Sequence, residues 1–421
     1  MTPHYEDAGL RLWHGSNKDI LPAFADASFD SIITDPPYEL GFMGKGWDSS
    51  GIAFDVEVWR ECLRVLKPGG HLLAFGGTRT WHRIAAAIED AGFEIRDSIA
   101  WLYGSGFPKS MNVGVAIDKM LGNERGDVFA DRQPVTSNEV YGKCLGVSKI
   151  ASVPGSAESA MWEGWGTALK PAFEPIIVAR KPLNGTVAAN VLAYGTGALN
   201  VDATRVPTDD SLGGGSQTRG RTMNGGWDRP WMHDAEAVEA SAARARAQVE
   251  KAESLGRFPA NVLLDESQAA ALDEQTGILT SGANPAVRGG DTDKRAVYGG
   301  FTGGRNEQSR RGTDSGGGSR FFPVFRYEAK APSSERPEVN GTVHATVKPL
   351  GLMRWLVRLI TRPGGRVLDV FAGSGTTGEA ALLEGMEVDL IELEAAHLPL
   401  ILQRVRKPLQ PSMFGDWDGA A

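Results

Sequence analysis

The sequence predicts an α/β fold, a doubly wound sheet with helices on both faces, and three observations indicate it. The first 100 residues alternate apolar, strand-like runs with stretches of helical spacing. The same alternation returns after Val343. Between these two parts, Gly-rich and polar segments interrupt the pattern, and such segments cannot pack a core of their own. We therefore expect one large domain with an irregular insertion.

The composition is that of an ordinary globular protein. The 421 residues are 41% hydrophobic and 23% charged, which is enough to bury a full core. No apolar run reaches the ~18 residues of a membrane span, and residues 1–10 lack the apolar core of a signal peptide. Cys62 and Cys144 form neither a disulfide framework nor a metal-ligand pattern with the histidines. We expect a reduced, cytoplasmic protein that binds no metal and no membrane.

The charge is acidic overall but uneven along the chain. The formal net charge is −8, whereas proteins that grip only the phosphate backbone are usually basic. Residues 288–320 differ, because they hold seven Lys or Arg against four Asp or Glu. If nucleic acid is the substrate, the positive surface must be local, and this stretch is a candidate for it.

Apolar runs and helical spacing place the regular elements. We expect strands at 10–13, 29–34, 71–75, 94–103, 173–179, 366–371 and 386–391, and helices at 59–66, 81–91, 235–254, 350–361 and from a Gly-rich turn to 384. Lys67-Pro68-Gly69-Gly70 is expected to stop the helix before it. The helix at 235–254 is rich in Ala, Glu and Arg, so we expect it to lie in solvent.

A glycine motif lies between the last two expected strands. Gly373, Gly375 and Gly378 have G-x-G-x-x-G spacing directly after a strand and at the start of a helix. Glycine lets backbone N–H groups approach a ligand without a clashing Cβ. Glu392 closes the next strand, about 20 residues on, where an acid can bind ribose hydroxyls. No lysine follows the glycines as it does in a P-loop. The motif alone therefore leaves three interpretations open, namely a structural turn, an NAD or FAD site, and an S-adenosylmethionine site, and the last is favoured.

The position of this motif predicts a rearranged fold. Only about 45 residues follow the motif, whereas a Rossmann-like sheet needs about five or more strands. The remaining strands must therefore come from upstream sequence. We predict a circularly permuted Rossmann-like sheet, in which the cofactor half comes last.

A second motif, Asp35-Pro36-Pro37-Tyr38, follows the expected strand 29–34. Ligands of open α/β sheets bind beyond the carboxyl ends of strands, so this turn should face the cofactor. An exocyclic base amine is a poor nucleophile, and a carboxylate oxygen with a rigid Pro36 carbonyl could accept both of its hydrogens. Tyr38 offers a flat face for an extruded base. The alternative, an ordinary Pro-Pro turn with a packed tyrosine, is disfavoured beside the glycine motif.

At these residues the chain resembles the beta group of amino-methyltransferases, bacterial and phage DNA N6-adenine and N4-cytosine enzymes in which the catalytic motif precedes the cofactor motif. The segments 59–75, 170–182 and 344–350 resemble further segments of that group. The resemblance implies a class I methyltransferase sheet with a target-recognition insertion. It implies a catalytic half at 1–182, the target-recognition insertion at 183–337 and an S-adenosylmethionine-binding half at 338–421.

The resemblance also assigns the site. Asp35, Pro36, Pro37 and Tyr38 would hold the target base and its amine. The cofactor would be bound by Asp369, Phe371, Ala372, Gly373, Ser374, Gly375 and Thr376, with Glu392 on the ribose and Lys348 on the cofactor carboxylate. No metal is implied.

The implied reaction is methyl transfer from S-adenosylmethionine to a base in double-stranded DNA, with the base flipped out of the stack. Asp at the first position of the tetrapeptide is typical of N6-adenine members, and Ser is commoner in N4-cytosine members. We therefore expect N6-adenine, with N4-cytosine as the alternative. An RNA or protein amide methyltransferase and a non-catalytic DNA-binding relic are less favoured. Family members often dimerise, and no motif indicates a partner endonuclease.

Three smaller predictions concern the insertions. The basic stretch 288–320 is interpreted as a DNA-contacting loop or a surface loop. Residues 321–327 are expected to pack in the core rather than to stack on bases. The weakly patterned stretch 104–169 contains residues 106–110, which are expected beside the catalytic pocket.

Overall fold

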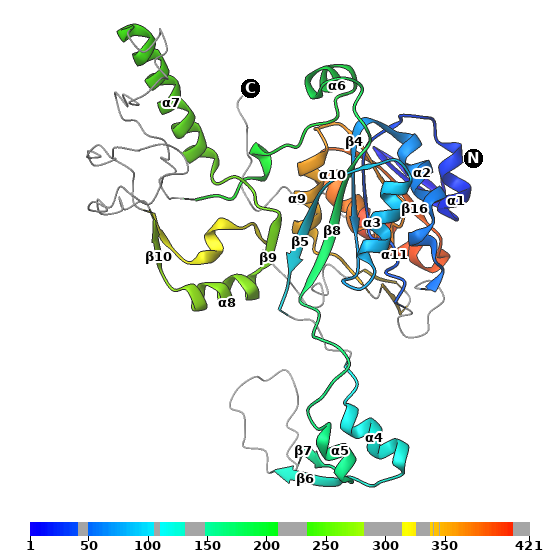
Figure 1. The fold of residues 1–421 in the computed structure, drawn as a ribbon. Coiled ribbons are helices and arrows are strands. Elements are labelled where there is room, and N and C mark those ends of the chain that lie inside the picture. Colours follow the sequence, from blue (N-terminus) through cyan, green and yellow to red (C-terminus); the bar gives the residue numbers. More distant parts are fainter. Residues whose placement is uncertain are drawn as a thin grey trace, which may run out of the picture. The chain divides into compact units, whose positions relative to one another are not determined.

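The computed structural model describes most of the chain (Figure 1). The described residues are 1–40, 49–104, 110–130, 148–208, 234–281, 314–325, 337–339, 341–344 and 346–406. They form two compact units, one of Met1–Gly104 with Phe173–Ala421 and a smaller one of Ser105–Ala172. None of the helices in these ranges is both long and apolar enough to cross a membrane.

The larger unit is built on a ten-stranded sheet among the described residues. In spatial order, its strands are β1 (Tyr5–Asp7), β2 (Leu10–His14), β16 (Glu387–Glu392), β15 (Arg366–Asp369), β3 (Phe29–Thr34), β4 (Leu66–Phe75), β8 (Phe173–Arg180), β5 (Glu94–Leu102), β9 (Val262–Asp265) and β12 (Val324–Phe325). The strands from β2 to β4 run parallel. β8 is antiparallel to both of its neighbours.

The strand order confirms the predicted permutation. β15, from the end of the chain, lies between β16 and β3, and it pairs in parallel with β3 through Val367 and Ser31 and through Leu368 and Ile32. Parallel neighbours end at the same edge of a sheet. The turn after β3 and the turn after β15 therefore lie side by side, although more than 300 residues separate them.

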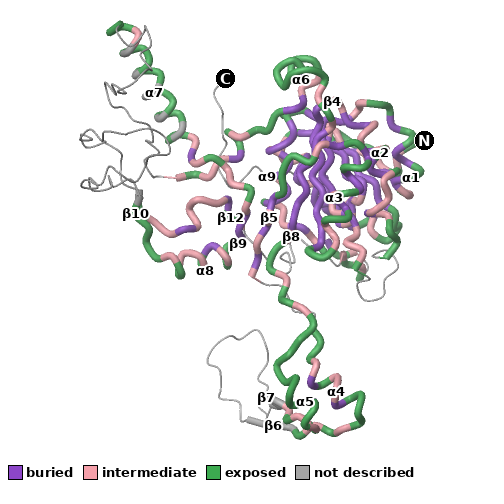
Figure 2. The backbone as a smooth tube through the Cα atoms, viewed as in Figure 1, coloured by how far each residue is buried: buried purple, intermediate pink, exposed green. Residues whose placement is uncertain are grey.

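Helices cover both faces of the sheet, as predicted. α1 (Asn17–Ile20), α2 (Val56–Val65) and α3 (Trp81–Asp90) cover one face, and α9 (Leu350–Ile360), α10 (Thr376–Leu383) and α11 (Leu398–Val405) cover the other. Consecutive strand residues serve opposite cores, because side chains alternate along a strand. Ile32 packs in one core and Ile33 in the other. The central strands are consequently buried on both faces (Figure 2).

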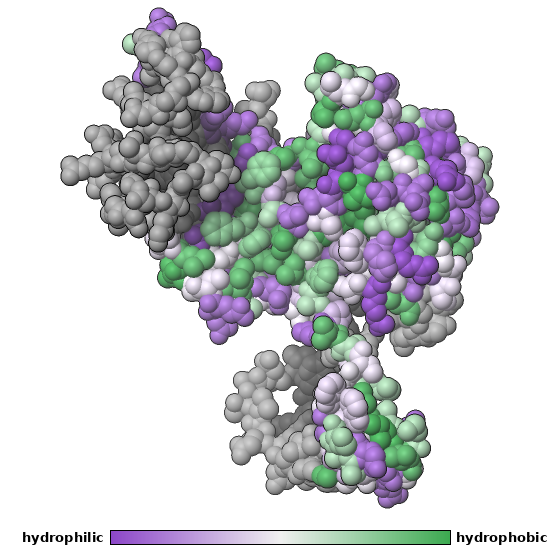
Figure 3. All heavy atoms as spheres, in the orientation of Figure 1, coloured by the Kyte–Doolittle hydropathy of each residue, from purple (hydrophilic) through white to green (hydrophobic). Residues whose placement is uncertain are grey.

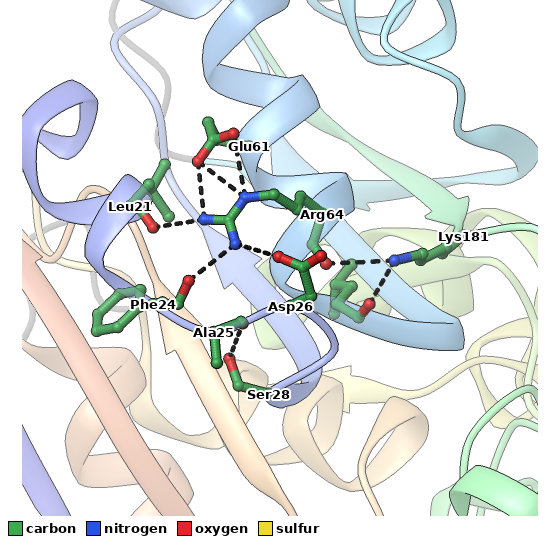
Figure 4. A network of polar contacts seen from close by, with 9 residues as sticks. Leu21, Phe24, Ala25, Asp26, Ser28, Glu61, Arg64 and Lys181 are labelled. Atoms are coloured by element: carbon green, nitrogen blue, oxygen red, sulfur yellow. Dashed lines mark hydrogen bonds and ion pairs between the residues drawn. The ribbon is translucent and has the colours of Figure 1, made fainter.

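Arg64 ties α2 to the chain that precedes β3 (Figure 4). Its guanidinium donates to the carboxylates of Glu61 and Asp26 and to the carbonyls of Leu21 and Phe24, at 2.6 to 3.1 Å. A planar guanidinium with five donors suits this dispersed set of acceptors. The contacts fix α2 against η1 (Leu21–Ala23), and β3 begins a few residues later.

Most predicted elements are confirmed to within a few residues. The helix stop predicted at 67–70 is confirmed, because α2 ends at Val65, but β4 begins at Leu66, earlier than the predicted strand at 71–75. The strand tolerates the extra residues as an irregularity in its pairing with β3 between Phe29 and Ser31. α7 (Ala235–Leu255) confirms the predicted solvated helix, with exposed side chains along its described residues.

The contacts divide the chain differently from the predicted boundaries at 182 and 337. The smaller unit lies within the predicted catalytic half. β9 and β12 come from the predicted insertion but extend the main sheet, because β9 pairs with β5, β12 pairs with β9, and Leu263 packs in the core. The helices α6 (Val187–Tyr194) and α8 (Glu266–Thr276) also lie within the predicted insertion. Residues 288–313 and 105–109, which carry two of the predictions on insertions, lie outside the described residues.

The smaller unit consists of α4 (Val113–Leu121), β6 (Gly126–Ala130), β7 (Ser148–Val153) and α5 (Ala157–Met161). Asp118 is its buried polar centre and accepts from Arg125 Nη1 at 2.8 Å, Ser156 Oγ at 2.9 Å and Gly155 N at 3.0 Å. Burial disfavours the charged carboxylate, but these donors lower the pKa of Asp118 to about 2. Hydrophobic residues colour part of this unit's visible surface (Figure 3), and Trp162 and Trp165 are among its exposed side chains.

Candidate active site

The last residues of β3 and β15 join the two sequence motifs. Thr34 Oγ1 donates a hydrogen bond of 2.7 Å to Asp369 Oδ1, and both residues are buried. Asp35 begins the first motif directly after Thr34, and Val370 begins the glycine turn directly after Asp369. The sheet therefore brings the residues predicted for the base and those predicted for the cofactor to one edge.

Asp369 organises the start of the glycine turn. Its Oδ1 also accepts from the backbone N–H of Phe371 at 3.1 Å. Burial raises the pKa of Asp369 to about 6, and the negative charge of Asp35 adds to the rise, although hydrogen bonds from Thr377, Thr34 and Phe371 oppose it. A carboxylate held in this way fixes the turn but leaves the buried charge poorly solvated.

The glycine turn has the shape that the motif predicts. Gly373 and Gly375 have φ values of +52° and +77°, which favour glycine. A Cβ on Gly373 would lie 3.0 Å from His344 Nε2, and one on Gly375 would lie 3.0 Å from the side chain of Ile401. α10 begins at Thr376, so its positive N-terminal end meets the turn. Ala372, Ser374 and Thr376 are buried around it.

Glu392 closes the other side of this turn. It lies at the end of β16, and its Oε2 accepts from the backbone N–H of Gly373 at 2.7 Å, while Oε1 accepts from Glu394 N at 2.8 Å. His397 Nδ1 lies 3.2 Å from Oε1. His344 packs edge-on against His397, with 4.7 Å between ring centroids, and burial and that neighbour lower the pKa of His344.

A second polar cluster surrounds the Asp35–Tyr38 turn. Lys348 Nζ lies 2.9 Å from Asp35 Oδ2, 3.0 Å from Glu174 Oε2 and 3.0 Å from the Tyr38 hydroxyl oxygen. The Tyr38 hydroxyl donates to the same Glu174 oxygen at 3.0 Å. Lys348 also lies over the ring of Phe75, 4.7 Å from its centroid.

The electrostatics of this cluster centre on one cation and two carboxylates. Burial disfavours the Lys348 ammonium, but Asp35 and Glu174 outweigh it and raise the pKa of Lys348. Burial and the same two carboxylates raise the pKa of Tyr38 well above its usual value. Lysine therefore stays an ammonium and tyrosine stays a neutral phenol that donates its proton.

One oxygen of this cluster has no partner. Asp35 Oδ1 is buried, and among the described residues it accepts no hydrogen bond. A buried acceptor without a donor costs about 1–3 kcal/mol, so such atoms are rare outside functional sites. Pro36 next to it is buried, and the Tyr38 carbonyl is fixed by Thr80 Oγ1 at 2.7 Å. The turn thus holds a free carboxylate oxygen in a rigid frame.

The Asp35 carboxylate and the glycine turn lie at one sheet edge, and the comparison with known families agrees with this arrangement. A DNA methylase family that covers N6 and N4 methyltransferases matches residues 29–403. The chain belongs to this DNA methylase family. The match confirms the resemblance to beta-group amino-methyltransferases, and members of the family use S-adenosyl-L-methionine.

The methylase has several relatives among characterised proteins. It is 28% identical over 149 residues to the type II methyltransferase M.HindIII of Haemophilus influenzae, which covers 34% of this chain and 38% of that protein. It is 36% identical over 107 residues to M.HpaI of Haemophilus parainfluenzae, covering 24% and 34%. The chain thus spans little more than a third of the length of these relatives.

Two solved structures are also similar to the methylase. One is a putative DNA modification methylase from Thermus thermophilus complexed with S-adenosyl-L-methionine, at 17% identity and a TM-score of 0.36, covering 94% of this chain and 92% of that one. The other is PvuII DNA methyltransferase (cytosine-N4-specific), at 13% identity and a TM-score of 0.42, covering 100% and 91%.

The structure gathers the predicted residues of the methylase at one sheet edge, in two groups. Asp369 and the glycine turn lie with Glu392, and Asp35 and Tyr38 lie with Lys348. Lys348 is predicted on the cofactor carboxylate, and this role stays a prediction; in the structure its ammonium contacts Asp35, Glu174 and Tyr38. Sequence reasoning did not single out Glu174, His344 and His397. For Glu174, the signal was a charged residue at the start of an otherwise apolar strand.

The raised pKa of Asp369 predicts a pH dependence of stability. Because the folded pKa of about 6 exceeds the usual 3.8, the protonated form stabilises the fold below about pH 4, and this contribution is lost as pH rises through about 6. Asparagine keeps the Oδ1 acceptor without the charge. We expect Asp369→Asn to gain about 3 kcal/mol of unfolding free energy relative to wild type between about pH 4 and pH 7.

Urea unfolding of both proteins across this pH range measures the difference. Asp202 is the control, because its hydrogen bond with Arg205 lowers its pKa, so Asp202→Asn should show no such gain with rising pH. Parallel stability curves for wild type and Asp369→Asn would contradict the prediction.

Proposed function

We propose that this methylase transfers a methyl group from S-adenosyl-L-methionine to N6 of adenine in double-stranded DNA. The observation that carries the proposal is the buried, unpartnered Asp35 Oδ1 at the edge where the glycine turn also lies. A hydrogen-bond acceptor for a substrate amine would be buried and without a donor in this way before the substrate binds.

The residues around the glycine turn fit the cofactor. Gly373 and Gly375 leave space that a Cβ would fill, the N-terminal end of α10 meets the turn, and Glu392 closes it. When bound, S-adenosyl-L-methionine supplies an electrophilic methyl group on a positively charged sulfur. Glu392 would take the ribose hydroxyls, in exchange for one of its present backbone donors. Lys348 would reach the cofactor carboxylate only by giving up one of its three oxygen contacts.

The base-binding residues supply positioning and charge. Asp35 Oδ1 and the Pro36 carbonyl would accept the two amine hydrogens and draw the nitrogen lone pair out of conjugation with the ring. In the transfer, the amine nitrogen would replace the sulfur on the methyl carbon, and Asp35 would take the proton that the amine loses. The site needs no covalent nucleophile for this step, because its contribution is orientation and electrostatics.

Tyr38 would stack on the flipped base. Its hydroxyl is held by Glu174 and Lys348, so the ring plane is set before the base arrives. Stacking of this kind contributes about 1–3 kcal/mol per base. The flipped base therefore recovers part of the few kcal/mol lost on leaving the duplex stack.

Adenine is proposed over cytosine because Asp35 opens the tetrapeptide, in keeping with N6-adenine members of the beta group. N4-cytosine is the alternative, since both amines require two acceptors. The region 183–337 is proposed as the target-recognition region, although two of its strands extend the main sheet.

The test is nucleoside mass spectrometry after the protein is incubated with S-adenosyl-L-methionine and unmethylated DNA. N6-methyladenine supports the proposal. N4-methylcytosine keeps the site chemistry and overturns the choice of base. No methyl group on DNA, in a protein that binds the cofactor, overturns the proposal and directs the search to RNA and protein amides.

The two groups of residues predict a division of roles. Asp35→Ala removes the amine acceptor but lies on the base-binding turn, so methyl transfer should fall by at least about 100-fold while cofactor affinity changes little. Glu392→Gln should do the reverse, because it weakens the pocket for the ribose. Isothermal titration with S-adenosyl-L-methionine and a single-turnover assay measure both quantities. A large loss of cofactor affinity in Asp35→Ala would contradict the division.

The basic stretch predicts salt-dependent binding despite the net charge of −8. Phosphate contacts release counterions, so DNA affinity should fall steeply as salt rises. Replacing Arg310 and Arg311 with Ala should reduce the slope of log affinity against log salt by about 2. Arg60→Ala is the control, since Arg60 lies on α2 paired with Glu57. A flat salt response in wild type would argue against a local basic surface.

A further inference from the structure

Glu174 is the acid of the site that belongs to neither motif. It is the second residue of β8, and only 20% of its side chain is exposed. The six residues that follow it in the strand are buried. A carboxylate in such a place loses hydration, and burial of a charge is unfavourable unless it is paired. Its partners therefore indicate what it does.

A single oxygen of Glu174 receives two donors from the base-binding cluster. Oε2 lies 3.0 Å from the Tyr38 hydroxyl and 3.0 Å from Lys348 Nζ. Lys348 in turn lies 2.9 Å from Asp35 Oδ2. The phenol and the ammonium are thus drawn toward Glu174, and Asp35 shares the ammonium through only one of its two oxygens.

We infer that Glu174 is a positioning residue for methyl transfer, which holds the Tyr38 hydroxyl and Lys348 so that Asp35 Oδ1 stays free to accept the target amine. The inference rests on the proposed function. It assigns Glu174 no contact with the substrate, and it acts through the orientation of Tyr38 and the sharing of Lys348.

The contacts of Glu174 indicate what would change in the site if its carboxylate were removed. The charge of Asp35 and a hydrogen bond with its carboxylate already act on the Tyr38 hydroxyl, so a phenol released by Glu174 has Asp35 as its remaining carboxylate acceptor. Lys348 would then pair with Asp35 alone. Both changes place donors on the carboxylate that the amine requires, and a misplacement of about 1 Å at a reacting group can cost about 100-fold in rate.

The fold does not need this carboxylate. β8 is hydrogen-bonded along both sides, with β4 from Ile176 to Arg180 and with β5 from Phe173 to Arg180. Its apolar residues contribute to the cores on both faces. Glu174 lies at the exposed start of the strand, so its substitution should leave the sheet in place.

Two substitutions distinguish the effect of the Glu174 charge from the effect of its side-chain length. Glu174→Gln keeps the length of the side chain but loses the charge and the capacity to accept both donors well. Glu174→Asp keeps the charge but withdraws the carboxylate by one methylene. We expect both to lower the single-turnover rate of DNA methylation by about 10- to 100-fold, with little change in cofactor affinity or melting temperature. If the amide variant fails to fold, the Asp variant tests the same contacts.

Glu94→Gln is the matched control. Glu94 lies on the adjacent strand β5 and pairs with Arg180 of β8, away from the Tyr38 cluster. The same carboxylate-to-amide change there should leave the methylation rate unchanged. An equal fall in rate for Glu94→Gln and Glu174→Gln would indicate a general effect on the sheet and overturn the inference.

A double-mutant cycle with Tyr38→Phe tests the proposed route. If Glu174 acts partly by drawing the hydroxyl toward itself and not toward Asp35, Tyr38→Phe should slow the Glu174→Gln variant less than it slows wild type. Additive losses would overturn the inference, as would a Glu174→Gln variant with the wild-type rate or with weakened cofactor binding alone. A wild-type protein that methylates no DNA would instead overturn the proposed function on which the inference rests.

Discussion

The site depends on the parallel pairing of β3 with β15. This pairing joins a strand from the start of the chain to one from its end, and it makes both strands finish at the same edge. The hydrogen bond from Thr34 to Asp369 then fixes the two turns against each other, at 2.7 Å between buried atoms. The segment that holds His344 and Lys348 also links the two turns, because His344 lies beside Gly373 and Lys348 contacts Asp35.

Patterns of apolar residues predicted much of this arrangement. Strands such as Phe173–Arg180 are recognisable because both faces are buried, which gives a continuous apolar run from Ile176 to Ala179. The permutation was also predictable, since a glycine motif near the end of the chain leaves too few residues to complete its sheet. The residue types of Asp35, Gly373 and Glu392 then indicated the site, because each has a backbone or charge property that its role requires.

Other features depend on contacts that no local pattern encodes. Glu174 joins the site through Tyr38 and Lys348, which lie 136 and 174 residues away along the chain. The edge-on pair of His344 and His397 likewise exists only once α11 packs beside the glycine turn. The stretch 104–169 was recognised as a second extension, but its helices and strands were not predicted, because its centre is a polar network around Asp118 rather than an apolar core with regular spacing.

The sharing of Lys348 explains how the site keeps an acceptor free. Asp35 and Glu174 both lie within 3.0 Å of one ammonium, so their mutual repulsion is compensated by a cation between them. Had the ammonium bound both oxygens of Asp35, neither oxygen would be free of a competing donor when the proposed target amine binds. Because the ammonium and the Tyr38 hydroxyl both contact Glu174, Asp35 keeps one buried oxygen without a hydrogen-bond partner among the described residues. The cluster then carries one net negative charge, which would complement the positive charge that the proposed methyl transfer develops on the amine nitrogen.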